Sequence, residues 1–236
     1  MSPTFLIQVT SRALRHLLFR PTLGFMKQAI LAAAATLIFA ASHLEGSRSI
    51  DAAAAIRIYN YANVPTGQLA AARATADRIF ADAGISLQWT DCRTSAAGRG
   101  AADRLAGCTE LLREGHEFVL RLFESGTDEA NPYVALGTSM IDREARGGVL
   151  MTVNPRPVLA VAQRASMDPS ILLGRAIAHE LGHLLLGRVD HPRSGLMRAF
   201  WSQNELRGGR PADWRFSTEE AQLMRQGLRD RTWAAN

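Results

Sequence analysis

The stretch AIAHELGHLLLGRVDHPRSGLM, residues 176–197, contains three of the six histidines of the chain, two of them within an apolar run. Together with the preceding residues, positions 170–187 are apolar on nearly all sides, which predicts a buried central helix. Pro169 stands at the first helical position and Gly187 where a helix would end. Titratable side chains inside such a helix are costly unless a partner satisfies them.

Two histidines and one acid share this predicted helix. His179 and His183 are four residues apart, so both imidazoles project from one face, where two nitrogens can meet one metal ion. Glu180 is rotated by about 100° from His179, outside the coordination sphere but within reach of a metal-bound water. This is the H-E-x-x-H pattern of zinc hydrolases. The sequence therefore predicts one catalytic Zn²⁺ ion.

Zinc in a catalytic site needs a third protein ligand, and three residues are candidates. A glycine at position 187 can take the left-handed conformation and reverse the chain, which would bring His191 back toward the histidine pair. We favour His191 as the third ligand. Glu205 is the alternative, since zinc hydrolases with a downstream glutamate ligand exist, and Asp190 is a weaker option.

The motif H-E-L-G-H at 179–183, followed by Gly187, His191 and Met197 in the sequence SGLM, resembles the signature of the metzincin clan of zinc endopeptidases. The resemblance implies that Glu180 is the catalytic base, that the three histidines bind zinc, and that Met197 lies in a methionine-containing turn beneath the metal. The chain departs from the family in spacing. Its glycine is four and its third histidine eight residues after His183, where the family has three and six, and Ala199 replaces a tyrosine that some members keep.

The resemblance implies a zinc-dependent endopeptidase in which a zinc-bound water, deprotonated by Glu180, attacks a peptide carbonyl, and the N-terminal segment described below predicts that it is secreted. The substrate would be a peptide or protein, aligned by backbone pairing along an edge strand near 134–141. Two alternatives stay open at this point. One is a secreted protein in which zinc has no catalytic role, although such a site favours four protein ligands and has no use for Glu180. The other is a zinc amidase acting on cell-wall peptides.

The order of predicted elements indicates an α+β fold of zincin type. Strands are expected at 56–64, 85–92, 117–125, near 133–141 and at 148–154, and helices at 67–84, 170–187 and from 217 onward. A strand, a helix and a strand at the start predict a parallel βαβ unit. We expect a mixed, mostly parallel, twisted five-stranded sheet with a backing helix and an active-site helix. A small, mainly helical C-terminal subdomain would follow.

The N-terminus has the features of an export signal. Residues 29–41 form an apolar run behind Lys27 that is too short to span a bilayer, and small residues follow it. We predict an extension with a signal peptide over 1–42, with Met26 as a candidate initiator, a linker over 43–55, and a catalytic domain over 56–236. The upper subdomain would be 56–187 and the lower 188–236. The alternative is an uncleaved membrane anchor.

Because export to the periplasm or the medium would place them in an oxidising compartment, we predict a disulfide between Cys92 and Cys108, the only two cysteines of the chain, with two unpaired thiols as the alternative. Such a bridge is expected to contribute about 3 kcal/mol to stability.

The net charge of +5 arises largely at the N-terminus. Four of the 27 Lys and Arg residues precede residue 43, which leaves 23 against 22 Asp and Glu. A nearly neutral folded part argues against a nucleic-acid partner, and no membrane contact is expected after signal cleavage. The oligomeric state is not predicted.

Overall fold

The computed structural model describes residue 50 and residues 52–92, 108–112, 115–124, 135–142 and 147–234, all within one compact unit. The predicted signal peptide and most of the predicted linker lie outside these residues. The elements, in chain order, are β1 (Ala52–Asn60), α1 (Thr66–Asp82), β2 (Ile85–Asp91), β3 (Glu117–Leu122), β4 (Gly137–Asp142), β5 (Gly147–Val153), α3 (Pro155–Ala165), α4 (Pro169–Leu186), α5 (Gln203–Gly208), the 3₁₀ helix η1 (Pro211–Trp214) and α6 (Thr218–Ala234).

The five strands form one mixed sheet in the order β2-β1-β3-β5-β4. β2, β1, β3 and β5 run parallel to one another, and β4 runs antiparallel to β5. β1, α1 and β2 make the expected parallel βαβ unit. The predicted fold class, a mostly parallel five-stranded sheet with helices, is confirmed. Among the described residues, β4 is therefore the edge strand at one end of the sheet.

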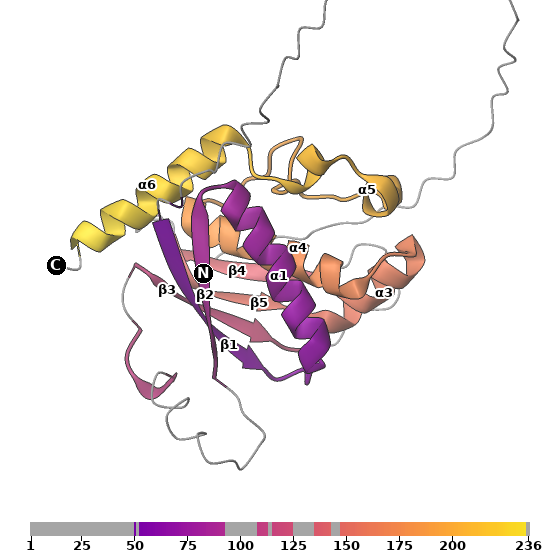
Figure 1. The fold of residues 1–236 in the computed structure, drawn as a ribbon, viewed down its shortest axis with the longest axis horizontal. Coiled ribbons are helices and arrows are strands. Elements are labelled where there is room, and N and C mark those ends of the chain that lie inside the picture. The colour runs from indigo at the N-terminus through magenta and orange to yellow at the C-terminus, as the bar shows by residue number, and fades with distance from the viewer. Residues whose placement is uncertain are drawn as a thin grey trace, which may run out of the picture. The chain divides into compact units, whose positions relative to one another are not determined.

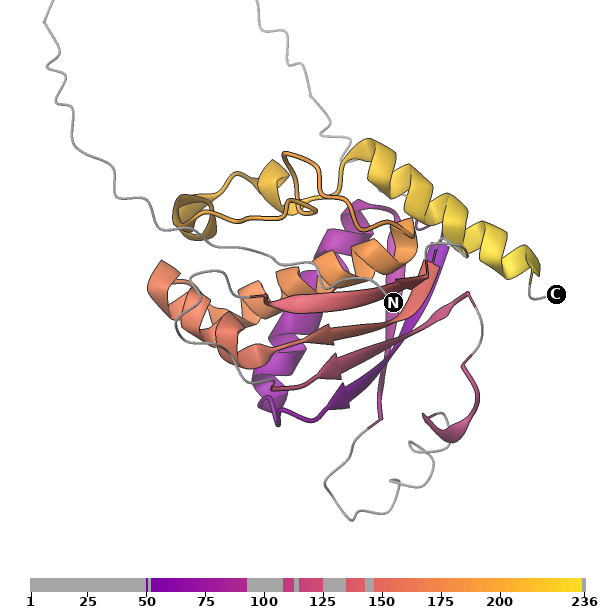
Figure 2. The ribbon, with the colours of Figure 1, turned by 180° about the vertical axis from the view of Figure 1, so that it is seen from behind.

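Helices α1 and α4 cover one face of the sheet, in front of it in Figure 1 and behind it in Figure 2. α4 contacts both β4 and β5, and α1 contacts both α4 and β2. The core fills the space between these layers with apolar side chains from alternating strand positions, such as Ile56, Ile58, Phe118, Leu120 and Met151. Burial on this face is what holds α4, the predicted active-site helix, against the sheet.

The ends of α4 follow the sequence prediction. The Asp168 side chain accepts a hydrogen bond from the backbone N–H of Ser170 at 2.8 Å, and Pro169 fills the first helical position. Gly187 caps the C-terminus with φ of 61°, a left-handed conformation that favours glycine. Nearly every side chain of this helix is buried. The chain is thereby forced to leave the helix sharply after Leu186.

The start of β1 and the presence of α3 differ from the sequence prediction. β1 begins at Ala52 rather than at 56, because the first alanines pair with β2 in parallel register even though alanine has little intrinsic strand preference. No helix was expected from the sequence between β5 and α4, but the structure has α3 there. Pro155 and Pro157 suggest a loop by composition, yet both lie in the first turn of α3, where a missing N–H is tolerated.

The part after α4 consists of a loop and the helical elements α5, η1 and α6, as the predicted helical C-terminal region requires. The loop and α5 lie beside one another above the sheet in both views (Figures 1 and 2), and α6 packs on α4. None of the helices in the described ranges is long and apolar enough to cross a membrane.

Candidate functional site

The helix α4 presents His179 and His183 on one face. The two residues are 1% and 2% exposed, and their Nε2 atoms are 3.0 Å apart. Spacing of one helical turn brings the two rings together, with their centroids 4.7 Å apart. Two imidazole nitrogens at this distance either share a proton or bind one cation, depending on which ring nitrogens are protonated.

His191 completes the cluster from the loop that follows Gly187. Its Nε2 lies 3.3 Å from that of His179 and 3.1 Å from that of His183. Among the described residues, these three histidines form a group whose ligand atoms all lie within 4.8 Å of one another and could hold a metal ion. A loop two residues longer than the metzincin spacing therefore still brings the third imidazole back to the pair.

Backbone carbonyls fix the orientation of the two helical rings. His179 Nδ1 lies 3.0 Å from the carbonyl oxygen of Leu196, and His183 Nδ1 lies 2.9 Å from that of Arg188. A carbonyl oxygen only accepts, so each Nδ1 carries the proton and donates it. The Nε2 atoms are therefore left with lone pairs directed into the cluster, which is the orientation of metal-binding histidines.

Burial keeps these rings neutral. It lowers the pKa of His179 well below its usual value and that of His183 to about 4, with further lowering of the His179 pKa by His183. Burial also lowers the pKa of His191, against the raising effect of Asp190. The cluster thus gathers neutral imidazoles, the form that binds metals.

The geometry fits a tetrahedral zinc ion. Zinc–nitrogen bonds of about 2.0–2.1 Å in tetrahedral geometry place the ligand nitrogens about 3.3 Å apart. The three Nε2 separations of 3.0, 3.1 and 3.3 Å are close to this value. Lone pairs at these distances repel one another unless a cation lies between them. Three protein ligands leave the fourth position of a tetrahedron open, as in catalytic rather than structural zinc sites.

Glu180 lies beside this cluster and is 1% exposed. Its Oε2 accepts a hydrogen bond from the hydroxyl of Ser139 on β4 at 2.6 Å, whereas its Oε1 is buried and has no hydrogen-bond partner among the described residues. Burial raises the pKa of Glu180 to about 8, although the Ser139 hydrogen bond lowers it. The carboxyl group therefore has one fixed oxygen and one oxygen available to another molecule.

Met197 packs against the same turn of α4 and is 1% exposed. A Cβ atom at Gly182 would lie only 2.6 Å from its sulfur atom and 2.8 Å from the ring of Phe216. The absence of a side chain at 182 thus lets the loop approach the helix between the two histidines. The adjacent carbonyl of Leu196 orients His179, so the predicted methionine turn and the histidine cluster form one packed unit.

The other two candidate ligands lie elsewhere. Glu205 lies in the first turn of α5, where its Oε2 accepts from the Ser202 backbone and hydroxyl at 2.7 Å and its Oε1 pairs with Arg198. The side chain of Asp190 is 69% exposed and faces Arg188. Neither belongs to the group of potential metal ligands in the described part of the chain.

The predicted disulfide is confirmed: Cys92 and Cys108 are bonded, with their Cα atoms 5.4 Å apart. It lies at the end of β2, and the loop that it closes, residues 93–107, is outside the described residues. The backbone N–H of Cys92 also donates to the carbonyl of Ile58, which joins the disulfide to β1. The bridge therefore anchors the sheet and not the histidine cluster.

Aromatic side chains that the motif does not include support the cluster. Trp201 is fully buried and packs edge-on against His179 and Trp214, with centroid distances of 5.8 and 5.3 Å. The guanidinium of Arg175 lies 3.5 Å from the centre of the Trp214 ring. No local sequence pattern predicts this stack, because its members come from α4, the following loop and η1.

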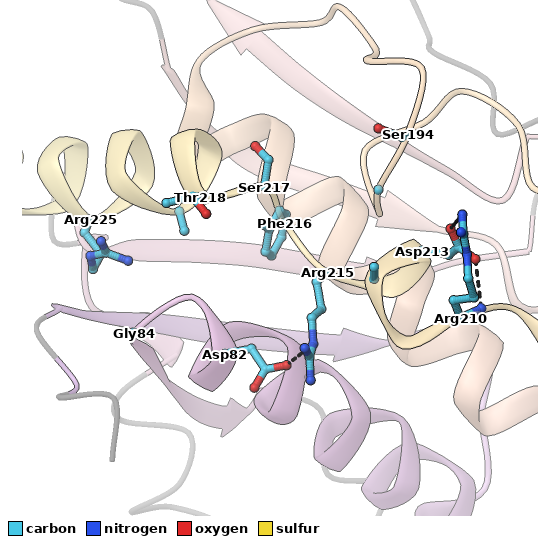
Figure 3. A pocket seen from close by; sticks show the side chains of 13 residues that line it. Asp82, Gly84, Ser194, Arg210, Asp213, Arg215, Phe216, Ser217, Thr218 and Arg225 are labelled. Atoms are coloured by element: carbon cyan, nitrogen blue, oxygen red, sulfur yellow. Dashed lines mark hydrogen bonds and ion pairs between the residues drawn. The ribbon is translucent and has the colours of Figure 1, made fainter. Parts of the chain in front are cut away.

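A separate pocket lies between the C-terminus of α1, the loop before Met197 and the start of α6 (Figure 3). Its charged side chains are paired within it. Arg215 contacts Asp82 at 2.7 Å and Arg210 contacts Asp213 at 3.7 Å, and Arg225 donates to the carbonyl of Ala83 at 2.5 Å. None of the three histidines lines it. The candidate metal ligands therefore lie outside this pocket.

The chain matches no protein-family model and no curated protein. It is similar to the crystal structure of a zinc-dependent peptidase from Methanocorpusculum labreanum (strain Z), with 13% sequence identity and a TM-score of 0.45. The match covers 72% of this chain and 99% of that chain. At this level of similarity, the chemistry assigned to the site depends on its own geometry.

Proposed function

We propose that this protein is a zinc-dependent endopeptidase. The observation that carries the proposal is the convergence of three neutral imidazole nitrogens, 3.0–3.3 Å apart, next to a buried glutamate whose Oε1 has no partner among the described residues. A site with a purely structural metal is closed by four protein ligands and contains no unsatisfied acid. Here three ligands and one available carboxylate oxygen favour hydrolysis.

His179, His183 and His191 would hold the ion through Nε2, and the carbonyls of Leu196 and Arg188 keep the first two rings in the required tautomer. When bound, zinc lowers the pKa of a coordinated water toward about 7 and polarises a substrate carbonyl. Hydrolysis also requires a group that accepts a proton from the attacking water and delivers it to the leaving amine.

Glu180 supplies that group. As a carboxylate it accepts the proton of the attacking water at Oε1, and as an acid it then donates this proton to the nitrogen of the leaving amine. Burial favours its protonated form, which suits the second step, and the Ser139 hydrogen bond favours the ionised form, which suits the first. One residue can therefore serve both steps.

The substrate is an extended peptide that pairs with the edge of the sheet. β4 is the last strand in the sheet order, and α4 contacts it beside Glu180. A peptide added to this edge by backbone hydrogen bonds would run alongside the histidine cluster. Because backbone pairing extends on both sides of the reacting bond, this arrangement favours cleavage within a chain over removal of a terminal residue.

The protein is proposed to act outside the cytoplasm. The apolar run at 29–41 supports export, and the Cys92–Cys108 disulfide supports an oxidising compartment.

The test combines metal analysis with a peptide assay on the purified protein. We expect one zinc ion per chain by mass spectrometry of the metal, and cleavage of internal bonds in a mixture of fluorescence-quenched peptides. 1,10-phenanthroline should abolish the cleavage and added Zn²⁺ should restore it. Bound zinc without cleavage of any peptide would instead indicate a binding protein, and cleavage restricted to cell-wall peptides would indicate an amidase.

A further inference from the structure

The strand β4 contacts the catalytic glutamate at two positions. Ser139 Oγ lies 2.6 Å from Glu180 Oε2 and 2.8 Å from the Glu180 carbonyl oxygen. A Cβ atom at Gly137 would lie 2.6 Å from Glu180 Cγ and 2.8 Å from its Oε1. Residues two apart in a strand face the same side, so Gly137 and Ser139 form one surface against this carboxyl group.

The two carboxylate oxygens of Glu180 have different surroundings. The contact of Ser139 Oγ with Oε2, at 2.6 Å, is shorter than its contact with the Glu180 carbonyl oxygen, at 2.8 Å, so this hydrogen bond keeps Oε2 in place. Oε2 is thus held by Ser139, and Oε1 is left without a partner in the described part of the chain. Since Cγ, Cδ and the two oxygens of a carboxyl group lie in one plane, fixing Oε2 relative to Cγ and Cδ also fixes where Oε1 points.

Gly137 provides the space for this arrangement. Any side chain there would overlap Cγ, Cδ and Oε1 of Glu180, at distances of 2.6, 2.9 and 2.8 Å from its first carbon atom. The carboxyl group would have to turn away from its hydrogen bond with Ser139. The edge strand therefore combines a gap at one position with a hydroxyl donor two residues later.

We propose that Ser139 is a positioning residue that holds Oε2 of Glu180 so that Oε1 faces the reacting water, and that Gly137 leaves the room this requires. This inference rests on the proposed peptidase function. The strand that would pair with an extended substrate is also the strand that orients the base. Substrate backbone and base are thus held by one rigid element, which is what precise proton transfer requires.

The test compares Ser139→Ala with Ser139→Thr, which restores a hydroxyl on a strand-compatible side chain. Ser139→Ala should lower kcat about 10–100-fold, the usual loss for a supporting hydrogen bond, with KM within about 2-fold and one zinc ion per chain retained. Ser139→Thr should recover kcat to within about 3-fold of the original. The matched control is Thr152→Ala on β5, which removes a hydroxyl bonded to Arg121 and should leave kcat unchanged.

A crystal structure of the Ser139→Ala variant gives a readout that does not depend on activity. We expect the Glu180 carboxyl group to rotate or to occupy more than one conformer, whereas the unmodified protein keeps a single one. An unchanged kcat, an equal loss in Thr152→Ala, a loss of zinc, or an unmoved carboxyl group would overturn the inference. If the unmodified protein cleaves no peptide, the proposed function fails, and the carboxyl conformers still decide the role of Ser139.

Discussion

Two glutamates of this chain, Glu180 and Glu205, each bind a serine hydroxyl, but they differ in burial and in the partners of their second oxygen. Glu205 has partners on both oxygens, Ser202 on Oε2 and Arg198 on Oε1. Glu180 has Ser139 on Oε2 and no described partner on Oε1, although it is almost completely buried. An unsatisfied buried acceptor in a native protein requires an explanation. The difference separates an acid that stabilises a helix terminus from one that is available for chemistry.

The largest expected effect comes from neutralising each acid in turn. Glu180→Gln should lower kcat/KM by about 10²–10⁴-fold, the usual contribution of a general base, while zinc remains bound. Glu205→Gln should change kcat/KM by less than about 3-fold, because that carboxylate is outside the cluster. Both values come from one quenched peptide substrate. Comparable losses in the two variants would remove the distinction between the glutamates.

The metal-free protein offers a second comparison, in which the two acids should have opposite pH dependence. Burial raises the Glu180 pKa to about 8, so the folded state binds more protons than the unfolded state from about 4.5 upward, and stability is lost as pH rises toward 8. Burial also acts to raise the Glu205 pKa, but hydrogen bonds from Ser202 and the charge of Arg198 outweigh it and lower the pKa. The stability that Glu205 adds is therefore lost as pH falls.

Chemical unfolding with a chelator present, between pH 4 and pH 9, measures both effects. Relative to the unmodified protein, Glu180→Gln should gain stability as pH rises and level off above about pH 8, by an amount on the order of several kcal/mol. Glu205→Gln should lose stability relative to the unmodified protein above the usual glutamate pKa, and the difference should shrink in acid. Parallel curves for the two variants would contradict the assignment.

The smallest expected effect concerns Ser202, whose role is compared with that of Ser139. Ser202 caps α5, and Ser202→Ala should lower the unfolding free energy by about 1 kcal/mol without changing kcat. Ser217→Ala, which removes the same kind of cap from α6, is the matched control. The serine at position 139 should show the reverse pattern, with its main effect on kcat. Thermal unfolding and steady-state kinetics on one preparation distinguish the patterns, and a loss of kcat in Ser202→Ala would argue against them.

Features of the site that depend on local sequence were predictable. The helical spacing of His179 and His183, the proline at the start of α4 and the glycine at its end are all encoded within the helix itself. The parallel sheet and its edge strand followed from the order and alternation of the strands. The α3 helix was missed because its two prolines are also compatible with a loop.

Features that depend on contacts between distant segments were not predictable. The sequence left His191, Glu205 and Asp190 as alternatives, because the path of a loop after a turn is set by what it packs against. Here the packing of Met197 against Gly182 helps to hold that path. The contact of Ser139 with Glu180 spans 41 residues along the chain and has no motif. Only the fold brings these two residues together.

The central claim is that three imidazoles hold one zinc ion and leave a coordination position open. X-ray absorption spectroscopy at the zinc edge of the metal-loaded protein tests it most directly. We expect three histidine nitrogens at about 2.0–2.1 Å and one further light atom from solvent, with loss of a single histidine contribution in His191→Ala. A site closed by four protein ligands, or one in which His191→Ala leaves the spectrum unchanged, would contradict the account.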